Sequence, residues 1–116
     1  MNWFKKSQQE SYFGFKVVGY DPSRKIFYSI YDLSPYEVFI GKVFNNRNGI
    51  YLGTTKKFCL DYYICGTKDE DDEYLLTFEF RGNNIIKGNP SDRDSEILVD
   101  SGKIIEIEKI NKEEWC

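Results

Sequence analysis

Residues 74–80 have the sequence Tyr-Leu-Leu-Thr-Phe-Glu-Phe, which is the clearest structural signal in the chain. Tyr74, Leu76, Phe78 and Phe80 alternate with the residues at positions 75, 77 and 79. Successive residues of a β-strand point to opposite faces of a sheet, so this alternation predicts a strand with one buried face and one partly hydrated face. The expected core residues are Tyr74, Leu76, Phe78, Phe80, Ile105 and Ile107.

Further strands are predicted on both sides of this one. They cover residues 15–20, 25–31, 36–44, 50–52 and 85–86, together with a hairpin that joins 96–99 to 103–110 through a turn at 100–102. One helix is predicted over residues 56–64, with Thr54 or Thr55 as its N-cap and Gly66 as its stop. This order predicts an α+β fold, a small single domain with a mainly antiparallel β-sheet, whole or split, and one or two short helices.

The length of the chain, 116 residues, gives room for one hydrophobic core. Residues 1–12 are expected to form an N-terminal arm of that single domain. The longest apolar runs, such as residues 36–40, fall far short of the roughly 20 residues that cross a bilayer. Residues 1–10 also lack the apolar stretch of a secretory signal. We therefore expect a soluble, cytoplasmic protein.

Cysteine and histidine usage limits the chemistry of the chain. The three cysteines, Cys59, Cys65 and Cys116, show no metal-ligand spacing, and there is no histidine, so no metal site is expected. Their odd number favours a reducing compartment, and Cys59 is interpreted as a structural thiol. The absence of histidine excludes Ser-His-Asp and Cys-His catalysis, and the glycine-rich loops that bind phosphate in classical nucleotide folds are missing.

Charge is unevenly distributed along the chain. The formal net charge of −3 makes binding to nucleic acid by bulk electrostatics unfavourable. The run Asp69–Glu73 is the only block of like charge, and we interpret it as an exposed, mobile loop whose removal costs little stability. The same loop is the candidate contact for the basic surface of a protein partner.

A spaced pattern of short motifs remains after these exclusions. The run Gly49-Ile50-Tyr51-Leu52 is followed by Tyr62 on the predicted helix, and later by Ser95-Glu96-Ile97-Leu98-Val99. In this order and spacing the chain resembles the ADP-ribosyltransferase superfamily, in particular its poly(ADP-ribose) polymerase-like branch. The resemblance covers about a quarter of the chain in short pieces.

The resemblance implies an NAD site built around these residues. Tyr51 and Tyr62 correspond to the two aromatic side chains that hold nicotinamide by stacking and cation–π attraction. Glu96 corresponds to the catalytic carboxylate, which stabilises the positive charge that develops on the ribose as the glycosidic bond breaks. The implied arrangement places Tyr51, Tyr62 and Glu96 in one cleft, with the strands of Tyr51 and Glu96 as neighbours in a sheet that splits at that point.

Three further residues complete the implied NAD site. Asp94, two residues before Glu96, is expected on the same side of an extended segment, and Thr54 lies in the loop after the Tyr51 strand. Lys16 occupies the first-strand position at which the branch carries a histidine and other branches carry an arginine. Its ammonium can act there as a point charge, without the planar fork of an arginine.

Three functional classes remain open from the sequence. The first is a transferase that uses NAD to modify a protein or nucleic acid. The second is a catalytically inactive relative that keeps the nucleotide cleft. The third is a small acidic interaction protein, such as a phage-encoded inhibitor of a host defence system. A thermal-shift assay with NAD and ADP-ribose separates the first two classes from the third, because a ligand that binds only the native state raises its melting temperature.

Overall fold

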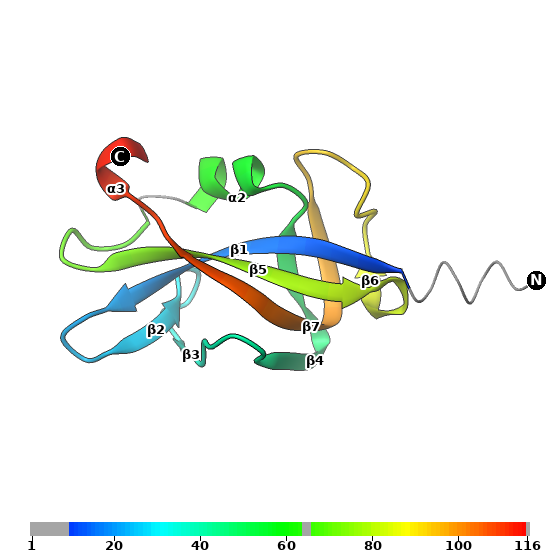
Figure 1. Ribbon diagram of the computed structural model, residues 1–116, viewed down its shortest axis with the longest axis horizontal. Helices are drawn as coiled ribbons and strands as arrows, with labels where there is room; N and C mark the ends of the chain where they lie inside the picture. Colours follow the sequence, from blue (N-terminus) through cyan, green and yellow to red (C-terminus); the bar gives the residue numbers. More distant parts are fainter. Residues whose placement is uncertain (1–9, 64–65, 116) are drawn as a thin grey trace, which may run out of the picture.

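The computed structural model describes residues 10–63 and 66–115. Its strands form one antiparallel sheet (Figure 1), so the predicted α+β fold with an antiparallel sheet is confirmed. The strands are β1 (Ser11–Asp21), β2 (Ile26–Ser29), β3 (Pro35–Tyr36), β4 (Val43–Gly53), β5 (Asp72–Arg81), β6 (Ile85–Lys87) and β7 (Glu96–Lys109). The helices are α2 (Lys56–Tyr63), the 3₁₀ turn η1 (Gly82–Asn84) and the short α3 (Lys112–Trp115).

The sheet bends until it closes on itself. β1 pairs with β5 along residues 11–20 and touches β4 on its other edge through the single pair Phe15 and Gly53. β7 pairs with both β4 and β5 and completes the ring. β2 and β3 extend the sheet from β1, and β6 adds to β7. The sheet is therefore continuous between β4 and β7, where the resemblance implied a split.

The predicted hairpin at residues 96–110 is wrong, because β7 is one long bent strand. Its first part, Glu96 to Val99, pairs with the end of β4, and its second part pairs with β5. The sequence Asp100-Ser101-Gly102 is typical of a turn. Here Ser101 and Gly102 remain in the sheet opposite Asn45 and Phe44. The two ends of β7 pair with different strands while Ile97, Val99 and Ile104 share one core, and this tertiary packing overrides the local preference for a turn.

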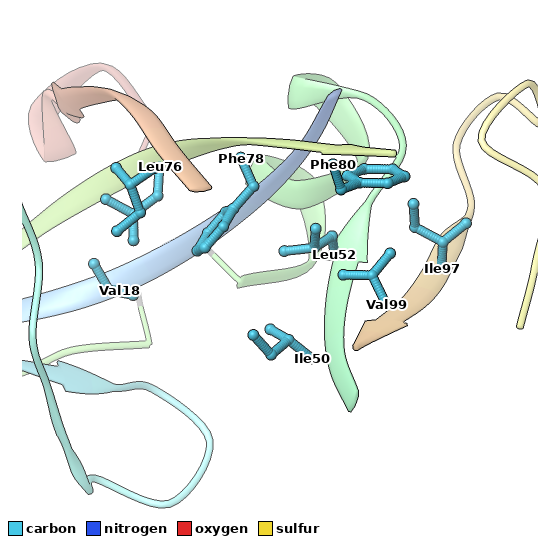
Figure 2. Close-up of a cluster of buried hydrophobic side chains, with 9 residues drawn as sticks. Val18, Ile50, Leu52, Leu76, Phe78, Phe80, Ile97 and Val99 are labelled. Carbon is cyan, nitrogen blue, oxygen red and sulfur yellow. The ribbon is translucent and has the colours of Figure 1, made fainter. Parts of the chain in front are cut away.

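The main core fills the interior of the bent sheet, and Figure 2 shows its side chains converging from β1, β4, β5 and β7. Leu76, Phe78 and Phe80 are buried as predicted, while Tyr74 and Ile107 pack at its margin. The full set is Val18, Ile50, Leu52, Leu76, Phe78, Phe80, Ile97, Val99 and Ile104.

Ile105 was expected in this core, but its neighbour Ile104 takes the position. The register of β7 against β5 shifts between the pairs Thr77 with Glu106 and Phe78 with Ile104. This β-bulge leaves Ile105 as the extra residue and changes the face on which the preceding residues lie. Ile104 is fully buried, whereas Ile105 is partly buried and lies outside both core clusters.

We expect the two isoleucines to differ strongly on truncation. Ile104→Ala removes packing from a fully buried site and should lower the free energy of unfolding by about 3 kcal/mol. Ile105→Ala should lower it by about 1 kcal/mol, since that side chain keeps contact with solvent. Urea unfolding of both variants measures the difference. Equal losses would show that the bulge lies elsewhere in β7.

A second, smaller core lies between the sheet and α2, so β5 is buried on both faces rather than one. Leu75 and Thr77 are both buried, and Leu75 packs with Cys59, Val17 and Ile110. α2 begins where predicted, with Thr55 as its N-cap, because the Thr55 hydroxyl accepts a hydrogen bond from the Phe58 N–H at 3.1 Å. In Figure 1 α2 lies above β1 and β5.

The ends of several elements differ from the prediction. β1 begins at Ser11, so Ser11 and Tyr12 pair with β5 rather than belonging to an N-terminal arm. Residues 1–9 lie outside the described part of the chain, as does Cys65. Of the predicted strand at 36–44, only its two ends join the sheet, and Phe39 and Ile40 between them are exposed. Within the described ranges no helix has the length and apolar character needed to cross a membrane.

The acidic run is anchored rather than free, which corrects the prediction of an exposed loop. Glu73 is 0% exposed and accepts hydrogen bonds from the N–H and the hydroxyl of Thr67. Asp71 is also buried and accepts a hydrogen bond of 2.6 Å from the Tyr28 hydroxyl. Buried carboxylates need such donors because leaving them unpaired is costly. Asp69 and Glu70 remain exposed.

Candidate functional site

A cavity of about 760 Å³ opens where β1 is bordered by two different strands. β4 pairs with β1 only at Phe15, and β2 pairs with β1 from Val18 onward. On the edge of β1 that faces away from β5, residues 16 and 17 are therefore left without a strand partner. The lining comes from most elements of the fold. It comprises Phe15, Lys16, Val17, Ser29, Ile30, Tyr31, Tyr36, Asn46, Gly49, Ile50, Tyr51, Gly53, Cys59, Lys87, Gly88, Glu96 and Leu98.

Tyr51 and Glu96 line this cavity from neighbouring strands. Tyr51 lies directly opposite Leu98 across the β4–β7 ladder, and Glu96 lies opposite Gly53. Leu98 and Glu96 are two residues apart, so Tyr51 and Glu96 share one face of the sheet. The expectation that their strands are neighbours is confirmed. Gly53 has no side chain, and a Cβ atom there would lie 3.1 Å from Cδ1 of Phe58 and 3.3 Å from Cβ of Cys59, so this glycine lets α2 pack closely on β4.

Lys16 reaches the cavity from the opposite face of the sheet. It pairs with Leu76 and therefore belongs to the face of β1 that carries the main core. Its ammonium lies 5.8 Å from the centre of the Tyr36 ring. Burial lowers the pKa of Lys16, and electrostatic interactions with Cys59, Glu96 and Asp32 partly oppose that shift. A cation thus stands at a position where the strand pattern calls for an apolar residue.

Two other ionisable groups of the cavity stay protonated at neutral pH. Burial, and then the charge of Asp32, raise the pKa of Tyr36 to about 12. Burial also raises the pKa of the Cys59 thiol to about 12, against a hydrogen bond from the Val17 backbone that lowers it. The Cys59 thiol thus accepts a hydrogen bond from the backbone of β1 where that strand has no strand partner. Because it stays protonated, Cys59 is not a thiolate nucleophile, which agrees with its interpretation as a structural thiol.

Thr54 and Asp94 lie beside the cavity and are not among its lining residues. The Thr54 N–H donates to the Ser95 carbonyl at 2.8 Å, and the Thr54 hydroxyl accepts from the Ser95 N–H at 3.0 Å. Asp94 accepts a hydrogen bond from the Thr55 hydroxyl. Its φ of 51° is left-handed, so the expected extended segment from Asp94 to Glu96 is wrong. These contacts fix the start of β7, and with it Glu96.

Tyr62 does not join the other predicted site residues. It lies on α2 with 71% of its surface exposed, and its ring contacts Phe58 at 4.6 Å. It is not among the residues that line the cavity. The helix presents the buried Cys59 to the cavity instead.

Several lining residues were not predicted from the sequence, chiefly Tyr31, Tyr36 and Lys87. Tyr36 arrives through the short pairing of β3 with β2, and Lys87 through the pairing of β6 with β7. Neither residue belongs to a motif, and their approach depends on tertiary pairing. No local signal could have identified them.

Comparisons of the chain with protein-family models, with curated proteins and with solved structures found no match.

Proposed function

We propose that this chain binds NAD or a related nucleotide in the cavity and acts as an ADP-ribosyltransferase-like domain. One observation carries the proposal: Lys16, Tyr51 and Glu96, which are far apart in the sequence, line the same cavity. A cavity of this volume, walled by aromatic residues and holding a few polar groups, is typical of small-molecule sites.

The aromatic wall suits a flat ring that carries positive charge. Tyr51 offers one face for stacking and cation–π attraction to nicotinamide. Tyr36, whose phenol stays neutral, is the second aromatic side chain in the proposed site and replaces Tyr62 in that role. Lys16 and Lys87 supply the positive charges that attract the phosphates of a dinucleotide.

Glu96 is the group proposed for the chemical step. Its carboxylate accepts a hydrogen bond from a ribose hydroxyl and stabilises the positive charge that develops as the bond to nicotinamide breaks. NAD supplies the ADP-ribose group, and a protein or nucleic acid is the proposed acceptor. Thr54, Thr55 and Asp94 act on this step only by holding the start of β7 in place.

The experiment compares Glu96→Gln with the wild type and with Glu106→Gln, an exposed carboxylate on the same strand. We expect Glu96→Gln to reduce nicotinamide release from NAD by about a hundredfold or more, while the NAD-induced rise in melting temperature persists. Glu106→Gln should behave as the wild type. A wild-type protein that shows the thermal shift without nicotinamide release belongs to the inactive class, and one that shows neither contradicts the proposal.

A second candidate function is that of a non-enzymatic interaction protein. Its support is a group of large apolar side chains exposed along one short stretch of chain. They are Tyr31, Leu33, Phe39, Ile40 and Val43. Exposed apolar groups of this kind are common where proteins bind one another. The exposed carboxylates of Asp69 and Glu70 are the remaining part of the acidic run available to a basic partner.

A further inference from the structure

Lys16 differs from the other partly buried lysines of the described chain in what surrounds its ammonium. Lys42 forms an ion pair with Glu37 at 3.0 Å, and Lys112 donates three hydrogen bonds. Among the described residues, Lys16 has the ring of Tyr36 at 5.8 Å and neither an ion pair nor a hydrogen bond for its ammonium. A buried ammonium without such partners loses its proton more readily than an exposed one.

The charged and titratable groups that face Lys16 come from several elements. Glu96 and Asp32 carry negative charge, Lys87 carries positive charge, and Tyr36 and Cys59 are protonated. Burial is the largest influence and lowers the pKa of Lys16. At neutral pH the neutral amine is therefore more populated at Lys16 than at an exposed lysine.

We propose that Lys16 is a nucleophile that forms an imine with small aromatic aldehydes entering the cavity. An amine is nucleophilic only when it is neutral, and desolvation in an apolar pocket is a known way to activate lysine. The aromatic class follows from the walls, since Phe15, Tyr31, Tyr36 and Tyr51 all face the cavity.

The proposed step is balanced by the loss of one water. The amine nitrogen of Lys16 attacks the aldehyde carbon, and the C–N bond forms as the carbonyl π bond opens to a carbinolamine. The nitrogen then gives up a proton, the former carbonyl oxygen leaves as water, and the C=N bond remains. The Glu96 carboxylate lines the same cavity and can carry the proton from nitrogen to the leaving oxygen.

This inference is independent of NAD binding, although both involve Lys16. A bound dinucleotide fills the cavity and holds Lys16 protonated, so NAD should protect Lys16 from aldehydes if the proposed function is correct. If NAD binding fails, the labelling of Lys16 remains and the protection is lost. The two proposals can therefore fail separately.

The test uses 4-hydroxybenzaldehyde as the probe, with sodium cyanoborohydride to trap the imine near neutral pH. Intact-mass analysis and peptide mapping follow the modification over time. We expect one dominant adduct on Lys16, formed faster than on any other lysine by a factor of about three or more. α-Amino groups also react with aldehydes, and peptide mapping separates such an adduct from that of Lys16.

Two variants serve as matched controls. Lys16→Arg keeps the charge but removes the nucleophile, so the dominant adduct should disappear. Lys42→Arg changes another partly buried lysine, one outside the cavity, and should leave the labelling unchanged. Circular dichroism shows whether each variant folds. Peptide mapping of the labelled wild-type protein tests the proposal even if a variant fails to fold. Labelling spread evenly over the lysines, or concentrated on a lysine other than Lys16, would overturn the proposal.

Discussion

Gly19→Ala is expected to destabilise the protein by about 3 kcal/mol or more, because the ring of Tyr28 lies directly on Gly19. The two residues face each other across the β1–β2 ladder. A Cβ atom on residue 19 would lie 2.3 Å from Cζ of Tyr28. The ring has little freedom to move, since its hydroxyl donates to the buried Asp71 at 2.6 Å. Relief of the clash breaks this hydrogen bond or displaces β2, and urea unfolding measures the loss.

Gly102→Ala is the matched control for this prediction. Gly102 is also a buried strand glycine, but a Cβ atom there would meet Phe78 Cδ2 at 3.4 Å, an ordinary contact. Its cost should stay below about 1 kcal/mol. In a Tyr28→Ala background Gly19→Ala should lose most of its effect, because the two residues are coupled. An unchanged cost in that background would contradict the proposed clash.

Lys112→Met should lower the free energy of unfolding by about 3 kcal/mol, because Lys112 holds the acidic run in place. Its ammonium donates to the carbonyls of Lys68 and Asp71 at 2.9 Å each, and to the Thr67 hydroxyl at 3.0 Å. The Thr67 hydroxyl in turn donates to the buried Glu73 at 2.8 Å. Methionine keeps the apolar stem of Lys112 and removes all three hydrogen bonds. It also removes a positive charge that is linked to the buried Glu73 carboxylate through the Thr67 hydroxyl.

The control for this prediction is Lys109→Met. Lys109 forms an exposed ion pair with Asp72 at 3.7 Å, and such pairs contribute about 0–1 kcal/mol. Chemical denaturation of both variants gives the two losses in free energy of unfolding, one for the exposed Lys109 and one for the hydrogen-bonded Lys112 near the same loop. If the two losses agree within about 0.5 kcal/mol, the hydrogen bonds of Lys112 carry no special weight.

The strands and the helix were predictable where the signal is local. The alternation in residues 74–80 requires only that neighbouring side chains point in opposite directions, and the structure contains that strand. The helix begins after Thr55, whose side chain caps its first turn. Periodicity and capping depend on residues within a few positions of each other, so one sequence contains the information.

The candidate site was predictable only in part. Glu96, Tyr51 and Lys16 were identified from motif order and line one cavity, but Tyr62 points elsewhere and Asp94 departs from an extended backbone. A helix of two turns fixes which residues share a face, yet its rotation against the sheet is set by packing. That rotation brought Cys59, rather than Tyr62, to the cavity.

The sequence alone thus determined the α+β class, the antiparallel strands and the position of the helix, because these depend on local periodicity and capping. Only the tertiary structure decided that β7 is a single bent strand, that Ile104 replaces Ile105 in the core and that Glu73 is buried. Register, bulges and the partners of buried carboxylates arise from contacts between residues far apart in the chain. The cavity has the same origin, since it exists only where β4 and β2 border different parts of β1.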